Sequence, residues 1–481
     1  MLGKVRVGVV CAIGTLLSGL VSSGQSLPNL FPFANATGVL ETYNTKEQGP
    51  IDLTGPFFQS LGTNGRSCAS CHQPAQGWSI SGEEVKARFE RTQGLDPIFR
   101  TNDGSTCDHN IDTSTVGGRR KAYSLLINKG LIRVALQVPA NAEFQVVSVV
   151  NQYGCGDPST LSMYRRPLPS TNLRFLSTLM WDGRESSTQT GTQKITFATN
   201  PDDLLADLAH QSVDATNGHA QGSTLLTAKQ QKDIVDFEMS LATAQAFDFK
   251  AGALNGNGAT GGPVTLGTQT MQAFFVGIND PLGGNPHHTS FTPVIFNLFD
   301  AWAKSHSDNE NDDHEKGEDQ SNWRARIVRG QALFNSKPIN ITGVAGLNDD
   351  LKRPFIAGTC GTCHDSPNVG NHSVSVPLNI GVGDVNSPLD VSYLPTITLQ
   401  NKITHEFKTT TDPGRALISG QWQDVGRLKG PVLRGLSSRA PYFHNGSADS
   451  LGDVIDFYNK RFNIGFTPRE KIDLIAFLSA L

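Results

Sequence analysis

The chain has 481 residues, which is long enough for more than one domain, and its formal net charge is −4. This mild acidity excludes the strongly basic surface that marks nucleic-acid-binding proteins, and it gives no reason to expect an anionic membrane as a partner. Glycine (49) and proline (25) are frequent and charged residues make up only 17%, which is typical of a protein rich in long loops.

Residues 1–26 have the pattern of a secretory signal peptide. Lys4 and Arg6 precede an apolar run at 7–21, and small residues follow in "SSGQS". We therefore expect export to the bacterial periplasm, with an uncleaved membrane anchor as the alternative. No later apolar run reaches the roughly 18 residues that a membrane helix needs, so no membrane span is expected after signal cleavage.

The pentad C-x-x-C-H occurs twice, first in "SCASCHQPAQGW" and again in "GTCGTCHDSPN". The two copies consist of Cys68, Cys71 and His72 and of Cys360, Cys363 and His364. This pentad is the attachment pattern of c-type haem, in which two thiols bond to the porphyrin and the histidine ligates the iron. Zinc is the alternative, but it needs a second Cys or His pair beside each copy. The sequence predicts two covalently bound haem c groups.

Two further cysteines, Cys107 and Cys155, remain outside the pentads and the signal peptide. Because exported proteins meet an oxidising compartment, we predict a disulfide between them, with two free thiols as the alternative. In the chain-entropy model such a bond contributes about 3–4 kcal/mol to stability.

Two segments show helical spacing and frame an acidic stretch. Residues 227–245 place Ile234, Phe237 and Leu241 on one helical stripe. The stretch "KSHSDNENDDHEKGEDQSN" (304–322) is acidic and of low complexity, which favours a solvated linker. After it, "NWRARIVRGQALFNS" again has the spacing of a helix.

The last predicted helix closes the chain in "TPREKIDLIAFLSAL". Thr467 is the expected N-cap, Pro468 the first helical residue, and Glu470 the partner in a capping box. Its buried face is predicted to consist of Ile472, Ile475, Phe477 and Leu478.

Together these elements predict a mainly α fold with two cytochrome c-like helical haem domains and long loops. The expected boundaries are a signal peptide at 1–26, an N-terminal haem domain with insertions at 27–303, an acidic linker at 304–322, and a C-terminal haem domain at 323–481.

The ligand opposite each proximal histidine decides what each haem can do. Methionine is the usual choice for electron transfer, but the five methionines all lie outside 323–481. The second iron therefore takes another ligand or stays open. Downstream of His364 the candidates are His372, His405, His444, Tyr442 and Tyr458.

The stretch "LKGPVLRGLSSRAPYFHNGSADSLGDVIDFYNKRF" resembles the C-terminal motif of the bacterial di-haem cytochrome c peroxidase family. In that family a P-x-L-R-N element and an APYFH-[DN]-G element precede a helix that carries the sixth ligand. Matching them to 431–435 and 440–446 places this ligand at Tyr458. Peroxidases of the family have Met there, and the MauG branch has Tyr, so the chain resembles MauG at this position. A packed aromatic residue is the alternative for Tyr458.

The resemblance also implies roles between and beside the haems. "LMWDGRES" matches the family motif whose Trp lies between the haems, so Trp181 is expected to relay electrons. A core Trp beside a tight Asp182-Gly183 turn is the alternative. The stretch after the first pentad lacks the His that blocks the first haem in many members, which implies an open coordination position there.

The family further uses a Gln and, ten residues on, a Glu as the acid–base group. Here "DLAHQSVDATNGHAQ" (207–221) supplies Gln211 but no Glu, and His219 is either a proton shuttle or a plain loop histidine. Lys121 and Arg439 occupy the positions of the family's calcium ligands, so calcium is not expected.

The function implied by the resemblance is reduction of hydrogen peroxide at the haem of the first pentad. Electrons would be relayed through Trp181 from the haem of His364 and Tyr458, and a small periplasmic cytochrome or cupredoxin would donate them. The alternatives are MauG-like oxidation of a protein or organic substrate, a di-haem oxygenase of the rubber-cleaving type, which also lacks the Glu, and a pure electron-transfer cytochrome.

Overall fold

The computed structural model describes residues 25–108, 110–186, 201–270, 274–283, 285–303, 320–373 and 376–481. The predicted signal peptide and acidic linker thus fall almost entirely outside the described residues. Two of their edges are described: Ser26 already pairs with Asp52 in a strand, and residues 320–322 belong to a helix rather than to a linker.

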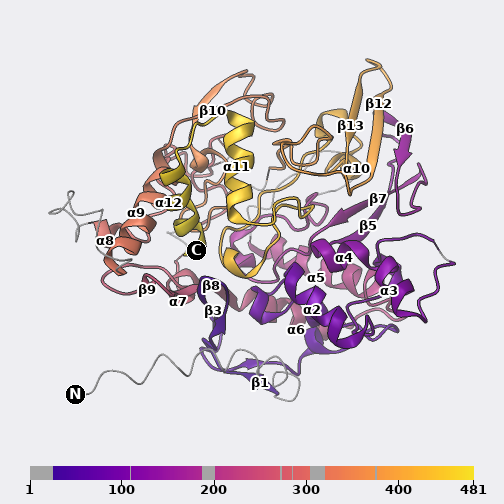
Figure 1. The fold of residues 1–481 in the computed structure, drawn as a ribbon, viewed down its shortest axis with the longest axis horizontal. Helices are drawn as coiled ribbons and strands as arrows, with labels where there is room; N and C mark the ends of the chain where they lie inside the picture. Colours follow the sequence, from indigo (N-terminus) through magenta and orange to yellow (C-terminus); the bar gives the residue numbers. More distant parts are fainter. Residues whose placement is uncertain are drawn as a thin grey trace.

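Helices contain more of the described residues than strands do. They are α2 (Gly82–Thr92), α3 (Val116–Ala122), α4 (Ser124–Lys129), α5 (Pro201–Gly218), α6 (Ala228–Met239), α7 (Pro263–Gly267), α8 (Asp300–Ala303), α9 (Gln320–Ser336), α10 (Ala416–Ser419), α11 (Leu451–Phe462) and α12 (Pro468–Ser479). Helices α2 to α6 gather on one side of the molecule, while α8, α9, α11 and α12 gather on another (Figure 1). None of the helices in the described residues is long and apolar enough to cross a membrane.

Strands are more frequent than a mainly α fold implies. They are β1 (Ser26–Leu27), β2 (Phe33–Ala34), β3 (Gly38–Asn44), β4 (Ile51–Asp52), β5 (Ile132–Gln137), β6 (Phe144–Val150), β7 (Thr160–Arg165), β8 (Leu241–Asp248), β9 (Gly252–Ala253), β10 (Ile339–Ile341), β11 (Ile356–Gly358), β12 (Thr396–Asn401) and β13 (Phe407–Thr410). They form five small antiparallel sheets among the described residues, of which β2-β3-β8-β9 has the most strands. The fold therefore combines helices with sheets.

The helix expected over 227–245 ends early. It has the predicted start, because Thr227 and Gln230 form a capping box, but α6 stops at Met239. Leu241 then begins β8, which forms seven residue pairs with β3, from Leu241 opposite Asn44 to Asp248 opposite Gly38. The interstrand hydrogen bonds, which depend on a segment 200 positions away, override the helical spacing of the local sequence.

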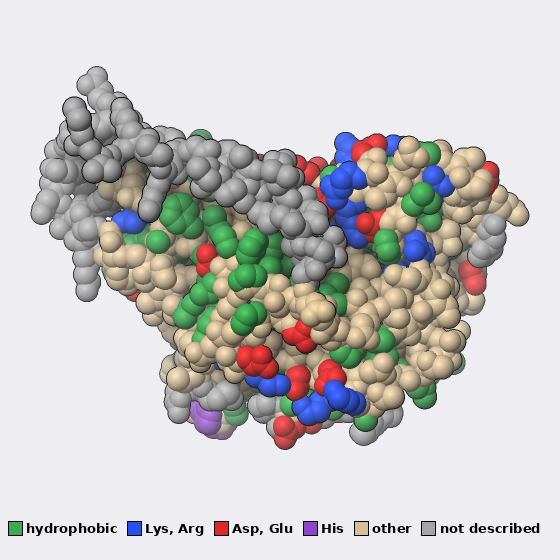
Figure 2. Space-filling model, turned by 90° about the horizontal axis from the view of Figure 1, so that it is seen from below, with side chains coloured by type: hydrophobic (Ala, Val, Ile, Leu, Met, Phe, Trp, Pro, Cys, Tyr) green, Lys and Arg blue, Asp and Glu red, His purple; other side chains and the backbone are tan. Residues whose placement is uncertain are grey.

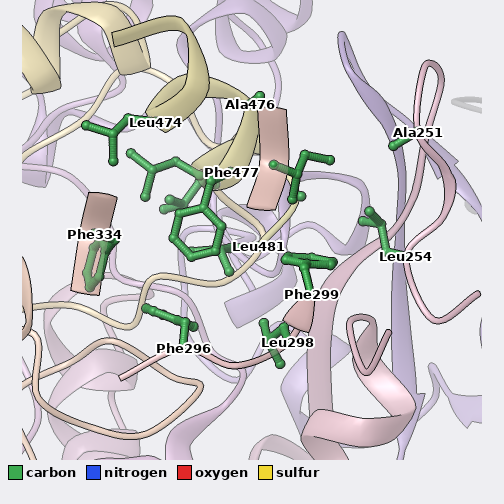
Figure 3. Close-up of a cluster of buried hydrophobic side chains, with 14 of the residues drawn as sticks. Ala251, Leu254, Phe296, Leu298, Phe299, Phe334, Leu474, Ala476, Phe477 and Leu481 are labelled. Atoms are coloured by element: carbon green, nitrogen blue, oxygen red, sulfur yellow. The ribbon is translucent and has the colours of Figure 1, made fainter. Parts of the chain in front are cut away.

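The main core joins the last helix to α9. Phe477 packs edge-on against Phe296 and Phe334, with Leu474 and Leu481 nearby (Figure 3). The two helices approach closely because residue 330 is glycine: a Cβ there would lie 2.1 Å from the carbonyl oxygen of Asp473. The predicted capping box of Thr467 and Glu470 is confirmed. Ile472 is 47% exposed, so its predicted place in the core is wrong, and Leu474 fills the buried face instead.

Segments from the two ends of the chain are interleaved. Strand β6 pairs with β12, so residues near 147 and 398 lie side by side. Arg165 forms buried ion pairs with both Asp182 and Asp412. These contacts fix the turn at 181–184 against the C-terminal part of the chain.

The remaining features of the fold are a disulfide and the distribution of surface charge. The predicted disulfide between Cys107 and Cys155 is confirmed. On the face shown in Figure 2, Lys and Arg side chains lie among Asp and Glu side chains rather than forming a field of one sign.

Candidate functional site

Each pentad lines its own large cavity. Cavity 1 contains Cys68, Cys71 and His72, and its empty volume, including the opening to solvent, is about 1620 Å³. Cavity 2 contains Cys360, Cys363 and His364, with a corresponding volume of about 1560 Å³. Residues from both halves of the chain line each cavity, so each cavity is a candidate site for a large planar group.

The first pentad lies on a short 3₁₀ turn, η3 (Cys68–Ser70). Ser67 caps it, with the side chains of Ser67 and Ser70 each accepting from the other's backbone N–H. The backbone N–H groups of Cys71 and His72 both donate to the Cys68 carbonyl, at 3.1 and 3.0 Å. This tight turn puts both thiols and the imidazole on the wall of one cavity.

His72 is held by its Nδ1 atom. Nδ1 donates to the Trp78 carbonyl oxygen at 2.9 Å, and the Ser170 hydroxyl oxygen lies 3.0 Å from the same nitrogen. Burial lowers the pKa of His72 to about 4, so the ring is neutral at pH 7. A neutral ring that donates from Nδ1 has a lone pair on Nε2, which is the arrangement that a metal-ligating histidine needs.

The second pentad repeats this geometry on η8 (Cys360–Thr362). Thr359 caps the turn, and His364 Nδ1 donates to the Gly370 carbonyl at 2.7 Å. Burial lowers the pKa of His364 to about 4 and raises that of the Cys360 and Cys363 thiols to about 12. All four pentad cysteines are free of disulfides.

The donor set fits haem better than zinc. Within the described ranges, two groups of three or more His, Cys, Asp or Glu side chains are close enough to share a metal ion, Glu185–His210–Asp214 and Asp280–Asp365–His372. Neither contains a cysteine, so neither thiol pair has the further protein ligands that a zinc site requires.

Cavity 1 is also rich in buried cations. Burial lowers the pKa of Lys429 to about 8 and that of Arg434 and Arg439 to about 10, and burial together with the charge of Arg439 lowers that of Arg166 to about 9. All four line the cavity, and Arg434 Nε has no hydrogen-bond partner. Buried charges are stable only when they are paired. A ligand that carries carboxylates, as haem does, would supply the missing charge.

Tyr458, which the resemblance predicts to be the sixth ligand, lines the same cavity as His364. It is on α11, and its ring lies 6.5 Å from the ring of His364 in an edge-on arrangement, both side chains lining cavity 2. Burial raises the pKa of its hydroxyl well above the usual range. Because the phenol forms part of the wall of cavity 2, a metal ion bound there would stabilise its ionised form.

Trp181 lines both cavities, as do Lys429 and Pro431. Its indole N–H donates to the Arg166 carbonyl at 2.7 Å, and its carbonyl accepts from the Lys429 backbone N–H at 2.8 Å. The ring is also edge-on to His444, 6.1 Å away. Gly183 makes the expected turn beside it, at φ 65°.

Gln211 and His219 both line cavity 1 together with His72. His219 directly follows α5, and its Nδ1 lies 2.9 Å from Asp103 Oδ2. Asp103 is buried and also accepts from Arg66 at 2.6 Å. Burial alone would raise the pKa of Asp103, but His219 and Arg66 lower it below its usual value. The carboxylate therefore orients the imidazole.

Glu238 is a cavity residue that sequence reasoning missed. It lies on α6, is 5% exposed and lines cavity 1. Burial raises its pKa to about 7, although a hydrogen bond with Ser170 opposes the shift. Since Ser170 also contacts His72 Nδ1, a chain of polar contacts runs from Glu238 to the proximal histidine. The only sequence signal was a carboxylate on the buried side of a helical stripe.

The two positions compared with the calcium ligands differ in their surroundings. Lys121 is exposed on α3. Arg439 donates to the backbone carbonyls of Val432, Arg434 and Gly435. Its guanidinium thus holds carbonyl oxygens of this loop together.

Peroxidases of known sequence are similar to part of the chain. It is 33% identical over 135 residues to the cytochrome-c peroxidase IdrP2 of Denitromonas iodatirespirans, covering 26% of this chain and 36% of that protein. It is 31% identical over 189 residues to the cytochrome-c peroxidase IdrP2 of Pseudomonas sp. strain SCT, covering 33% and 50%. The chain thus matches half or less of the length of these relatives. No model of a protein family matches it.

Two solved structures align along most of the chain at low similarity. One is a MauG-like protein associated with microbial copper homeostasis, with 14% identity, coverage of 95% and 93%, and a TM-score of 0.36. The other is a variant of the diheme peroxidase BthA from Burkholderia thailandensis, with 14% identity, coverage of 94% and 93%, and a TM-score of 0.27. With TM-scores below 0.5, neither carries an argument.

The sequence relatives confirm the resemblance to the bacterial di-haem cytochrome c peroxidases. Both relatives are named as peroxidases that use cytochrome c.

Proposed function

We propose that the chain is a periplasmic di-haem c-type oxidoreductase that reduces hydrogen peroxide in cavity 1 with electrons relayed from cavity 2. The observation that carries the proposal is that Trp181 lines both cavities, each of which contains a C-x-x-C-H turn. An indole shared by both walls offers a path for charge between two sites that perform different steps.

In each cavity, the pentad cysteines and the pentad histidine would hold different parts of a haem. Cys68 and Cys71 would bond to one porphyrin and Cys360 and Cys363 to the other, and Nε2 of each pentad histidine would ligate the iron. When bound, the haems supply iron that can coordinate a peroxide oxygen and change its oxidation state. The buried cations of cavity 1 would pair with carboxylates of the porphyrins.

Reduction of one hydrogen peroxide to two waters consumes two electrons and two protons. His219 is the residue we propose to move protons in cavity 1. Because its Nδ1 donates to Asp103, its Nε2 is available to accept a proton from one peroxide oxygen and deliver it to the other. Gln211 is placed to hydrogen-bond a small polar molecule in the same cavity.

A MauG-like activity is the second candidate, and Tyr458 favours it. A phenol oxygen bound to the second iron would stabilise its oxidised form, so that oxidising equivalents persist until a protein or organic substrate supplies electrons. The two activities share cavity 1 and Trp181 and differ in the source of the electrons.

The remaining proposals concern setting and domains. The disulfide between Cys107 and Cys155 supports an oxidising compartment such as the periplasm, where a small cytochrome or cupredoxin would be the donor. We retain two haem domains, 27–303 and 323–481, joined by the acidic segment. Five residues of the C-terminal part line cavity 1, so the second domain would complete the first site: Lys429, Pro431, Val432, Arg434 and Arg439.

A turnover assay tests the proposal. The holoprotein, purified with both haems, is mixed with hydrogen peroxide and a reduced small cytochrome c. We expect oxidation of two cytochromes for each peroxide consumed, and loss of this activity in His72→Ala. Oxidation of the cytochrome that is independent of peroxide would instead indicate an electron carrier. Peroxide consumption without any need for the cytochrome, but with oxidation of an added protein, would favour the MauG-like activity.

A further inference from the structure

A cluster of two carboxylates and one imidazole adjoins the second pentad. Asp365 directly follows His364, His372 comes seven residues later, and Asp280 belongs to the loop at 274–283. Their exposed fractions are 0%, 1% and 6%. One ligand atom from each lies within 4.8 Å of the others, and His372 Nδ1 is 2.9 Å from Asp365 Oδ2.

Several buried polar atoms in this cluster make no hydrogen bond to any residue that the structure describes, although Asp365 Oδ2 and His372 Nδ1 lie 2.9 Å apart. They are Asp365 Oδ2, Ser366 Oγ, Asn371 Oδ1, Ser373 Oγ and both ring nitrogens of His372. Leaving one such atom unsatisfied in a protein interior is unfavourable by about 1–3 kcal/mol. These unsatisfied atoms all lie within nine consecutive residues. We therefore infer that a bound ligand, rather than the protein, satisfies them.

Among the described residues, the ion-pair partner of Asp365 is His372, and no Lys or Arg side chain lies within ion-pair distance of this carboxylate. Two carboxylates and an imidazole that converge in a dry interior call for a cation between them.

We propose that Asp280, Asp365 and His372 bind one divalent first-row transition ion, Zn²⁺ or Mn²⁺. Carboxylate oxygen together with imidazole nitrogen is a donor set that these ions accept, whereas Ca²⁺ takes oxygen ligands only. The 2.9 Å separation of the Asp365 and His372 donor atoms agrees with neighbouring ligands that each lie about 2.1 Å from such an ion.

The ion has a structural role. Two hydrogen bonds already link the loop to the segment after the pentad: Asn279 Nδ2 donates to the Asp365 carbonyl at 3.3 Å, and the Gly277 N–H donates to the Ser373 carbonyl at 3.2 Å. An ion held by residues of both segments fixes them together, and with them the turn that carries His364. The site does not depend on which reaction occurs in cavity 1.

The other cluster of the same composition is a matched control. Glu185 is buried, but His210 and Asp214 are exposed on α5, so solvent can satisfy them. His210→Ala is therefore expected to leave metal content unchanged.

The test measures metals other than iron in the holoprotein purified without chelators. We expect about one Zn²⁺ or Mn²⁺ per chain in the wild type and in His210→Ala, and its loss in Asp280→Asn and His372→Gln. In a second measurement, wild-type holoprotein stripped with a chelator should melt about 2 °C or more higher when Zn²⁺ or Mn²⁺ is restored.

The stripping experiment keeps the proposal testable if the variants fail to fold. No non-iron metal in the wild type, together with an unchanged melting temperature on adding either ion, would overturn it. That result would mean that a protonated His372 balances the two carboxylates. Equal metal loss in His210→Ala would overturn it as well.

Discussion

The two cavities share one attachment unit and differ in the walls around it. Both pentads lie on capped 3₁₀ turns, and both histidines donate from Nδ1 to a backbone carbonyl. Cavity 1 adds polar and ionisable groups, including Gln211, His219 and Glu238. Cavity 2 adds mainly aromatic and aliphatic side chains, including Phe334, Phe443 and Tyr458.

This difference shows how one sequence motif serves two purposes. The motif determines how a cofactor is held, and the surrounding side chains determine what it can do. A wall with proton donors and acceptors suits a reaction that consumes protons, whereas an apolar wall suits a site that exchanges electrons. The predictions below remove or exchange the features that distinguish the cavities.

The largest effect is expected when one pentad is disabled. Cys68→Ser with Cys71→Ser should leave one covalent haem per chain, measurable by mass spectrometry, and reduce peroxide turnover to background. Cys360→Ser with Cys363→Ser should also leave one haem. That second variant should react with peroxide in a single event but lose at least about 99% of its steady turnover, a barrier increase near 2.7 kcal/mol. Wild-type turnover by this second variant would contradict the proposal that cavity 2 supplies electrons to cavity 1.

Removing the proton-transfer group should come next. His219→Gln is expected to slow turnover by about 100-fold or more, the usual size of a general acid–base contribution. The control is His210→Ala, nine residues earlier on the exposed side of α5, which should keep wild-type rates.

Asp103→Asn should reduce turnover less than His219→Gln does and should alter the pH profile, because it weakens the contact that orients His219. Equal rates for the two histidine variants would refute this role.

Trp181→Phe should have a smaller effect. It keeps an aromatic ring between the cavities but removes the N–H that donates to Arg166. We expect steady turnover to fall by about tenfold, equivalent to 1.4 kcal/mol, while the first reaction with peroxide keeps its rate in stopped-flow measurements. Trp302→Phe is the matched control, since its indole N–H also donates to a backbone carbonyl but it lies in the core. A slower first reaction would assign Trp181 to cavity 1 alone.

The smallest effect concerns stability and Glu238. Its folded pKa, about 7, lies above the ordinary value of 4.5, so the folded protein binds the proton more tightly than the unfolded chain does. The corresponding stability is present below pH 4.5 and is lost as the pH rises to about 7. Glu238→Gln should therefore flatten the dependence of unfolding free energy on pH by up to about 3 kcal/mol. Parallel curves for the two proteins would exclude a buried, protonated Glu238.

Local sequence was sufficient to predict the features that depend on neighbouring residues. The pentads, the capping box at Thr467 and the helix that begins near residue 322 all follow from short motifs. The disulfide was predictable because the compartment and an even cysteine count left one pairing.

Features that depend on distant pairing were not predictable in this way. Leu241 fits a helical stripe but belongs to a strand, because β3 lies beside it. Ile472 fits the apolar face of α12 but faces solvent, because α9 covers the other side. Asp103 and Arg66, which orient and neutralise the site around His219, carry no motif and come from loops far from it in sequence.

Electron paramagnetic resonance of the purified holoprotein, before and after one equivalent of hydrogen peroxide, tests the asymmetry of the cavities most directly. We predict one high-spin ferric signal from cavity 1 that peroxide removes at once, and a second signal that changes in Tyr458→Phe but not in His219→Gln. Two low-spin signals that do not change on adding peroxide, and that are the same in Tyr458→Phe, would contradict the proposed asymmetry of the two cavities.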